Sequence, residues 1–190
     1  MTINAGDLNQ RLRVLECRKD AEKNAYRWEE IGRLWAKAEP DDRRNLFSDV
    51  GIGARGVTFT IRSRPSLTLH QAFLWRGQHC FLTSVIPREN DRGYWTVKAA
   101  LVAPVDCQAD MDRDPHGICF PGILTEKYVG HDQPDFHSEV TTTYVLVTPK
   151  SVELRPGSWL VADGQYYLVL TPHLLDAYKN EFEIRRKEDC

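Results

Sequence analysis

Two stretches of this chain repeat the same order of residues. Four matched pairs carry the repeat, two at an offset of 85 and two at an offset of 87: Thr58–Ile61 with Thr143–Leu146, Ser66–Leu69 with Ser151–Leu154, Gly77-Gln78 with Gly164-Gln165, and Trp95–Val97 with Phe182–Ile184. One small insertion separates the two registers. A repeat of this length predicts a domain duplication, because a solenoid needs several units.

The repeated unit has the residue pattern of short β-strands. Its runs alternate apolar and polar residues with a period of two, which is typical of strands with one buried face. The expected strands are Leu8–Glu16, Leu34–Glu39, Val57–Arg62, Leu67–Leu69, Phe73–Trp75, His79–Ile86 and Tyr94–Val102. The spacing in Tyr26–Glu39 also permits a helix, and we favour the strand. The fold class is therefore mainly β, with two tandem small antiparallel β-barrels.

The duplication places the domain boundaries. Residues 1–103 form the expected first barrel, 104–121 a linker rich in Asp, Pro and Gly, and 122–190 a degenerate second copy. The linker segment also leaves room for a degenerate first strand of the second copy. Gly122–Tyr128 is expected to correspond to Leu34–Glu39.

A long loop is expected between two strands of the first copy. Pro40 should end the preceding run, Asp41-Asp42 can cap a short helix over Arg43–Val50, and several glycines follow. Loops on a small barrel are where function usually lies. The first loop's candidate residues are Asp41, Asp42, Arg43, Arg44, Asn45, Asp49, Gly51, Gly53 and Arg55. The shorter counterpart, Gly130–Glu139, offers His131, Asp132, Asp135 and His137.

Charge is unevenly spread along the chain. Residues 1–103 hold 17 Lys/Arg and 12 Asp/Glu, a net charge of +5, whereas residues 104–190 hold 8 and 15, a net charge of -7. This polarity indicates that the two halves meet different neighbours or stack on each other, and it disfavours a dedicated DNA-binding protein. The arginines of the first loop can contact phosphates or form ordinary solvated ion pairs, and charge pattern alone leaves both open.

The sequence gives no sign of a secreted or membrane protein. The N-terminus has no signal-peptide pattern, and no apolar run approaches the ~20 residues of a membrane span. The five cysteines include no CxxC pair, which fits a reducing cytoplasm.

Metal binding and catalysis are weakly supported. A zinc site from Cys107, His116, Cys119, His131 and His137 lacks the usual paired spacing, so we interpret the region as a polar linker with a buried thiol. No nucleophile elbow surrounds Ser66, Ser84, Cys80 or His79. We therefore expect no metal, no cofactor and no enzymatic activity. Four tryptophans, Trp28, Trp35, Trp75 and Trp95, are expected in the core, and Trp159 near the insertion at the surface.

The first copy resembles a known family over about residues 7–102. The residues that carry the resemblance are Leu12, Trp28, Trp35, Ala36, Ile61, Arg62, Gly77, Phe81, Val85 and Arg92. Their order and spacing are similar to those of the tailed-phage head-tail joining proteins, the head-closure, adaptor or stopper type. The duplication departs from typical members, which have a single domain.

The resemblance implies a structural virion protein of the head-tail neck, made in the host cytoplasm. It implies a ring of roughly six or twelve copies. A portal or adaptor ring would lie on one side, a tail terminator or tail completion protein on the other, and packaged double-stranded DNA in the channel that the long loop faces. The rival hypothesis is a tandem β-barrel module that binds single-stranded nucleic acid or peptide.

Overall fold

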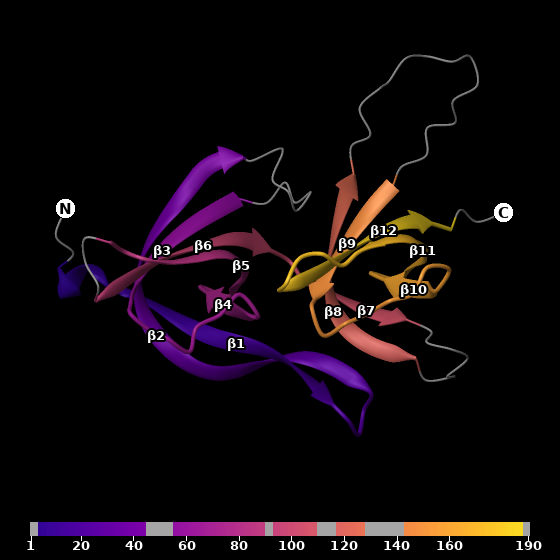
Figure 1. The fold of residues 1–190 in the computed structure, drawn as a ribbon, viewed down its shortest axis with the longest axis horizontal. Helices are drawn as coiled ribbons and strands as arrows, with labels where there is room; N and C mark the ends of the chain where they lie inside the picture. The colour runs from indigo at the N-terminus through magenta and orange to yellow at the C-terminus, as the bar shows by residue number, and fades with distance from the viewer. Residues whose placement is uncertain (1–3, 45–54, 90–92, 110–116, 128–142, 188–190) are drawn as a thin grey trace, which may run out of the picture. The chain divides into compact units, whose positions relative to one another are not determined.

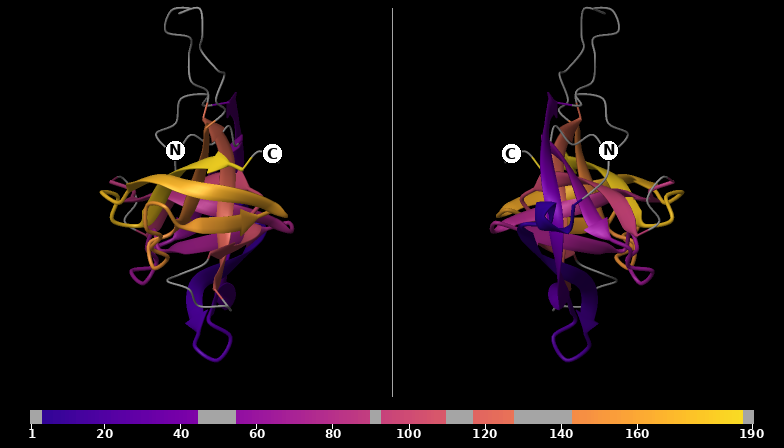
Figure 2. Two further views of the ribbon diagram at one scale, coloured as in Figure 1. Left: turned by 90° about the vertical axis from the view of Figure 1, so that its right-hand side faces the viewer. Right: turned by 90° about the vertical axis from the view of Figure 1, so that its left-hand side faces the viewer.

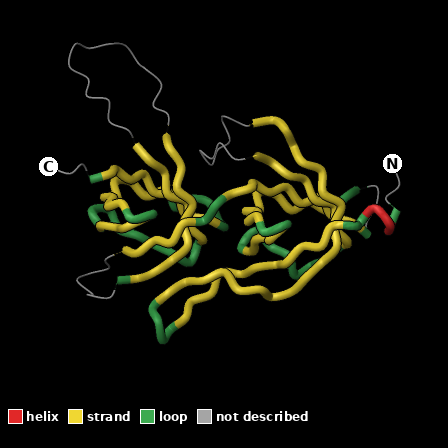
Figure 3. The backbone as a smooth tube through the Cα atoms, turned by 180° about the vertical axis from the view of Figure 1, so that it is seen from behind, coloured by secondary structure: helices red, strands yellow, loops and turns green. Residues whose placement is uncertain are grey.

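The computed structural model describes residues 4–44, 55–89, 93–109, 117–127 and 143–187. Nearly every element is a β-strand, and the helical element that it contains is a single 3-10 turn at Ala5–Asp7 (Figure 3). The prediction of a mainly β fold is confirmed. The described residues contain no helix with the length and hydropathy that a membrane span requires. The chain divides into two compact units, with the principal boundary between Pro104 and Val105.

The first unit is a sheet of six strands that closes on itself. The strands, labelled in Figure 1, are β1 (Gln10–Asp20), β2 (Ala25–Arg44), β3 (Arg55–Arg62), β4 (Gln71–Trp75), β5 (Gln78–Pro87) and β6 (Tyr94–Val102). They pair in the order β1-β4-β5-β6-β3-β2, and β2 pairs back to β1. A closed ladder leaves no unpaired edge, which removes the tendency of exposed edges to aggregate.

The second unit repeats this topology. Its strands are β7 (Val105–Ala109), β8 (Ile118–Lys127), β9 (Thr143–Pro149), β10 (Trp159–Ala162), β11 (Gln165–His173) and β12 (Lys179–Arg186). They pair in the order β7-β10-β11-β12-β9-β8, and β8 also pairs with β7. In the pairing order each strand takes the place of the strand six numbers earlier. The strands β9 to β12 are orange to yellow in Figure 2.

The repeat extends to local detail. Ile61 pairs with Trp95 across β3 and β6, and the matching residues Leu146 and Phe182 pair across β9 and β12. The β5–β6 ladder shifts register between Leu82 and Ser84, and β11–β12 shifts between Val169 and Thr171. These bulges fall 87 residues apart, so the offset found in the sequence preserves the register of the sheet.

The hairpin turns are also equivalent. Arg76 and Gly77 have φ of 52° and 79°, and Asp163 and Gly164 have φ of 49° and 72°. Two consecutive positive values are typical of the type I′ turn, whose twist matches that of the flanking strands. The Gly-Gln pairs of the sequence repeat therefore mark the same turn in both units.

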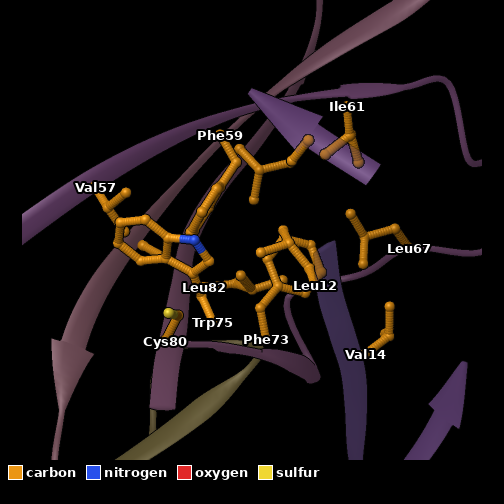
Figure 4. Close-up of a cluster of buried hydrophobic side chains, with 13 residues drawn as sticks. Leu12, Val14, Val57, Phe59, Ile61, Leu67, Phe73, Trp75, Cys80 and Leu82 are labelled. Atoms are coloured by element: carbon orange, nitrogen blue, oxygen red, sulfur yellow. The ribbon is translucent and has the colours of Figure 1, made fainter. Parts of the chain in front are cut away.

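The core of the first unit is built around the aromatic rings of Phe59 on β3 and of Phe73 and Trp75 on β4 (Figure 4). The Phe59 ring lies edge-on to Phe73 at 5.7 Å between centroids and to Trp75 at 5.6 Å. Leu12 and Ile61 complete the fully buried centre. Edge-to-face packing of this kind adds about 0.5–1.5 kcal/mol per pair beyond area burial.

The second core combines aliphatic side chains with the buried rings of Phe120, Tyr167 and Phe182, and it contains one buried amide. Leu146, Leu160, Phe182 and Ile184 are fully or almost fully buried. Asn180 is also buried, and its amide nitrogen donates to the carbonyls of Lys150 (3.1 Å) and Val152 (2.8 Å). This amide fixes the loop after β9.

Four boundary predictions need correction. Pro40 does not end a strand, since β2 continues through it and it pairs with Val57. Arg43 and Arg44 are strand residues, so a helix does not begin there. Leu67–Leu69 is part of a loop that buries Leu67, not a strand. The segment 104–121 holds β7 and the start of β8 instead of a linker, as the alternative of a degenerate first strand anticipates.

The two type I′ turns allow a matched test. Alanine disfavours positive φ, and a Cβ at Gly77 or Gly164 would meet no atom within 4 Å, so the cost is purely conformational. We expect Gly77→Ala and Gly164→Ala each to lower the free energy of unfolding by about 1 kcal/mol in urea titrations. Gly6→Ala, at an open site without positive φ, is the control and should have little effect. If only one of the two substitutions lowers the free energy of unfolding, the two turns are not equivalent.

Candidate functional site

The two candidate loops connect equivalent strands. The first runs from the end of β2 at Arg44 to the start of β3 at Arg55, and the second runs from the end of β8 at Lys127 to the start of β9 at Thr143. Since β8 and β9 repeat the positions of β2 and β3, both connections leave the same point of the repeated unit.

The structure describes only the stems of these loops. In the first stem Asp41 pairs with Gly56 and Arg44 with Arg55, with an irregularity between the two pairs. Asp42 and Arg43 belong to the same strand, β2. The remaining candidates lie outside the described residues: Asn45, Asp49, Gly51, Gly53, His131, Asp132, Asp135 and His137. The two ends of each predicted loop are therefore neighbours in the sheet, where Arg44 pairs with Arg55 and Lys127 with Thr143.

A groove of about 610 Å³ lies on the first unit, and sequence reasoning missed it. Its lining consists of Leu8, Leu34, Trp35, Arg62, Ser63 and Arg64. Ala36 pairs with Ile61 and both side chains are buried, so alternation places the preceding Trp35 and the following Arg62 on the outer face. Trp35 is 57% exposed, which corrects the expectation that it belongs to the core.

The other tryptophans differ in their burial. Trp75 lies in the first core and Trp95 packs against its edge. Trp28 is half-buried, and Trp159 is 44% exposed, as expected from its place near the insertion. The signal that could have placed Trp35 outside is the run Leu34, Ala36 and Ala38, whose period of two puts Trp35 on the opposite face.

Two guanidinium groups border the groove. Neither Arg62 nor Arg64 forms an ion pair with any residue that the structure describes. The Arg64 side chain lies over Gly32, where a Cβ would come within 3.1 Å of a guanidinium nitrogen. Gly32 therefore leaves room for Arg64. An exposed indole, two cations and an apolar floor can hold an apolar group that carries a negative charge beside it.

The second unit has no such groove at the matching positions. Register places Gly122 and Ile123 where the first unit has Leu34 and Trp35. Val147, Thr148 and Pro149 take the places of Arg62, Ser63 and Arg64, and all five residues are buried. The exposed aromatic and cationic residues are therefore a specialisation of the first unit.

His79 lies in β5, within the hairpin as expected, and its role is structural. Its ring lies 5.0 Å from that of Trp28, and burial lowers its pKa to about 4. Its Nε2 has no hydrogen-bond partner among the residues that the structure describes. The adjacent Cys80 thiol is buried as well, and the loss of solvation raises its pKa to about 12. A thiol with that pKa stays protonated at neutral pH and is a poor nucleophile.

The cysteines proposed for zinc do not converge. In the β7–β8 ladder Cys107 pairs with Phe120 and Gln108 with Cys119. Cys107 is buried and Cys119 is exposed, so the two thiols lie on opposite faces. Within the described ranges no cluster of three His, Cys, Asp or Glu side chains could hold a metal ion. His116, His131 and His137 lie outside those ranges.

Comparisons with known proteins give little further information. No family model matches the chain. No curated protein matches it either. Among solved structures, one chain of a "Virion of native gene transfer agent (GTA) particle" is similar over 48% of this chain and 92% of its own length, with 18% identity and a TM-score of 0.38. A likeness at this level adds no argument about function.

The buried imidazole predicts a pH-dependent stability. Because the folded-state pKa lies below the usual 6.5, the unfolded chain binds a proton first as the pH falls. Stability from His79 is therefore complete above pH 6.5 and is lost towards pH 4, by up to about 3 kcal/mol.

Urea unfolding of the protein and of His79→Leu at pH 7, 5.5 and 4 measures this contribution. The leucine variant should lose less stability on acidification than the parent. If both proteins lose the same free energy of unfolding on acidification, groups other than His79 cause the loss.

Proposed function

We propose that this protein is a non-enzymatic structural subunit of a phage-type head-tail connector, which forms a ring below the portal and joins head to tail. The observation that carries the proposal is the repeated placement of the long connections: both β2–β3 and β8–β9 open at the same point of the same six-stranded topology. The sequence resemblance to head-tail joining proteins supports the proposal, because it implies that this connection faces the DNA channel.

The architecture suits a ring subunit. Each unit is a closed sheet, so its backbone edges are satisfied and its distinguishing features lie in its loops and outer face. A unit of about 90 residues has a small core and gains stability from contacts with neighbouring copies. The scaffold thus supplies rigidity, and association supplies the remaining buried surface.

The charges fit contact with different neighbours. The half up to residue 103 carries a net +5 and the half from residue 104 a net -7, so one would face the portal side and the other the tail side. The first loop and its stems combine Asp41, Asp42 and Asp49 with Arg43, Arg44 and Arg55. A nearly neutral wall would let double-stranded DNA slide past without tight binding.

Electron microscopy tests the ring directly. The purified protein is imaged in negative stain alone and after mixing with portal-containing particles that lack a neck. We expect rings, or a new collar at the portal vertex, since a small closed unit buries its remaining surface by association. A protein that remains monomeric and leaves the particles unchanged contradicts the proposal.

A second candidate function is binding of single-stranded nucleic acid, which the exposed Trp35 and the two guanidinium groups beside it, Arg62 and Arg64, favour. Bases stack on aromatic rings and phosphates pair with guanidinium groups. This function predicts that a fluorescent oligonucleotide binds the monomer with an affinity that falls steeply with salt, and that Trp35→Ala weakens it at least about tenfold. Absence of binding at low salt eliminates it.

A further inference from the structure

The second unit presents an unusually apolar loop tip between β11 and β12. Leu175 is fully exposed at 103%, and Leu174 and Tyr178 are exposed as well. Three large apolar side chains thus stand in solvent within five residues. Single exposed leucines are common on protein surfaces, but a group of this kind is typical of a contact with another protein.

The tip is held in a defined conformation. The Asp176 carboxylate accepts hydrogen bonds from the backbone nitrogens of Tyr178 (2.7 Å) and Lys179 (3.2 Å). Lys150 Nζ donates to the carbonyl of Leu174 at 2.8 Å. An Asx-type turn therefore presents Leu175, and a pre-ordered contact residue loses less entropy on binding.

The duplication offers an internal comparison for the tip. The matching connection of the first unit, between β5 and β6, has the charged sequence Arg-Glu-Asn-Asp-Arg at 88–92. The second unit has Leu-Leu-Asp-Ala-Tyr at 174–178. Nothing in the shared fold requires leucines at this turn, so the apolar tip is a specialisation of the second unit.

The groove and the tip are complementary in chemistry. The groove offers Leu8 and Leu34 as an apolar floor with Trp35 beside them, and Arg62 and Arg64 at its border. The tip offers leucines next to the carboxylate of Asp176. The groove volume of about 610 Å³ lies within the ~300–1,000 Å³ of pockets that accept a ligand of drug size, which is ample for a loop tip. The opposite net charges of the two halves add long-range attraction.

We propose that the tip Leu174–Tyr178 of one copy docks into the Trp35 groove of the next copy. The two surfaces differ, so the contact is head-to-tail, and each copy can use both surfaces at once. Such a heterologous contact closes into a ring when its rotation permits. The proposal rests on the proposed ring and names its subunit contact. The apolar floor of the groove favours this occupant over nucleic acid, because a sugar-phosphate backbone offers Leu8 and Leu34 no apolar partner.

Self-association of the full chain tests the contact, by analytical ultracentrifugation across a concentration series. The tip variant is Leu175→Ser and the groove variants are Trp35→Ser and Arg62→Glu. Each should weaken self-association at least about tenfold, because a buried apolar anchor or an ion pair is lost. The matched controls are Ile86→Ser in the first unit and Tyr166→Ser in the second. These side chains are 53% and 60% exposed, and both lie outside the groove and the tip.

Asp176→Asn refines the electrostatic part. Asparagine keeps an oxygen that can accept the same backbone hydrogen bonds, so the tip should hold its conformation while losing its charge. We expect a few-fold weakening that disappears at high salt. Unchanged association at low salt would show that Arg62 and Arg64 do not face this carboxylate.

Mixing the variants tests the head-to-tail geometry. Leu175→Ser keeps its groove and Trp35→Ser keeps its tip, so an equimolar mixture should form a one-to-one complex and nothing larger. The inference is wrong if the parent stays monomeric at every concentration, if the controls weaken association as much as the variants, or if the mixture forms no pair. It is also wrong if the groove variants change only oligonucleotide binding.

Collar formation on portal-containing particles distinguishes a failure of this contact from a failure of the proposed function. If the variants still form a collar on portal-containing particles as the parent does, the connector function stands and this contact is wrong. If the parent itself forms no collar, the connector function fails whatever the variants do.

Discussion

Closure of each sheet by backbone pairing is the constraint on which the rest of the structure depends. In the first unit β2 must pair with β3 on one side and β1 on the other, which fixes which residues face inward. Ala36 and Ile61 then turn into the core, where Phe59, Phe73 and Trp75 pack edge to face. The same register turns Trp35 and Arg62 outward. The core and the groove therefore follow from a single alignment of two strands.

The duplication shows which features the fold requires and which are free to vary. Both units keep the strand order, the type I′ turn and the bulge 87 residues apart. Phe73 and Trp75 of the first core are replaced by Leu160 and Ala162 in the second, while Tyr167 takes the place of Cys80. The outer groove and the β11–β12 tip each occur in one unit. The cores thus exchange apolar side chains of different size within one strand order, whereas the surfaces differ in chemistry, because the sheet imposes no side chain there and a subunit meets other molecules on them.

Much of the fold could be predicted from the sequence. Alternation located the strands Val57–Arg62, His79–Ile86 and Tyr94–Val102 closely, because one face of each is buried. The match of Gly122–Tyr128 with Leu34–Glu39 agrees with the observed pairing, in which Leu124 opposes Leu146 as Ala36 opposes Ile61. The prediction was wrong at Pro40, where a neighbouring register irregularity accommodates the proline within a long strand. It was also wrong for Trp35, since size suggested burial and only the register reveals the outward face. The groove requires residues of β2, the end of β3 and the N-terminal segment to meet, and no local pattern contains that information.

In the proposed connector ring, the two long connections of each subunit face the DNA channel. Cryo-electron microscopy of neck-containing particles tests it most directly. We expect a symmetric ring in which the loop stems, Arg44 with Arg55 and Lys127 with Thr143, point towards the axis. A ring with these stems on its outer surface, or a neck that lacks this protein, would contradict the proposed function.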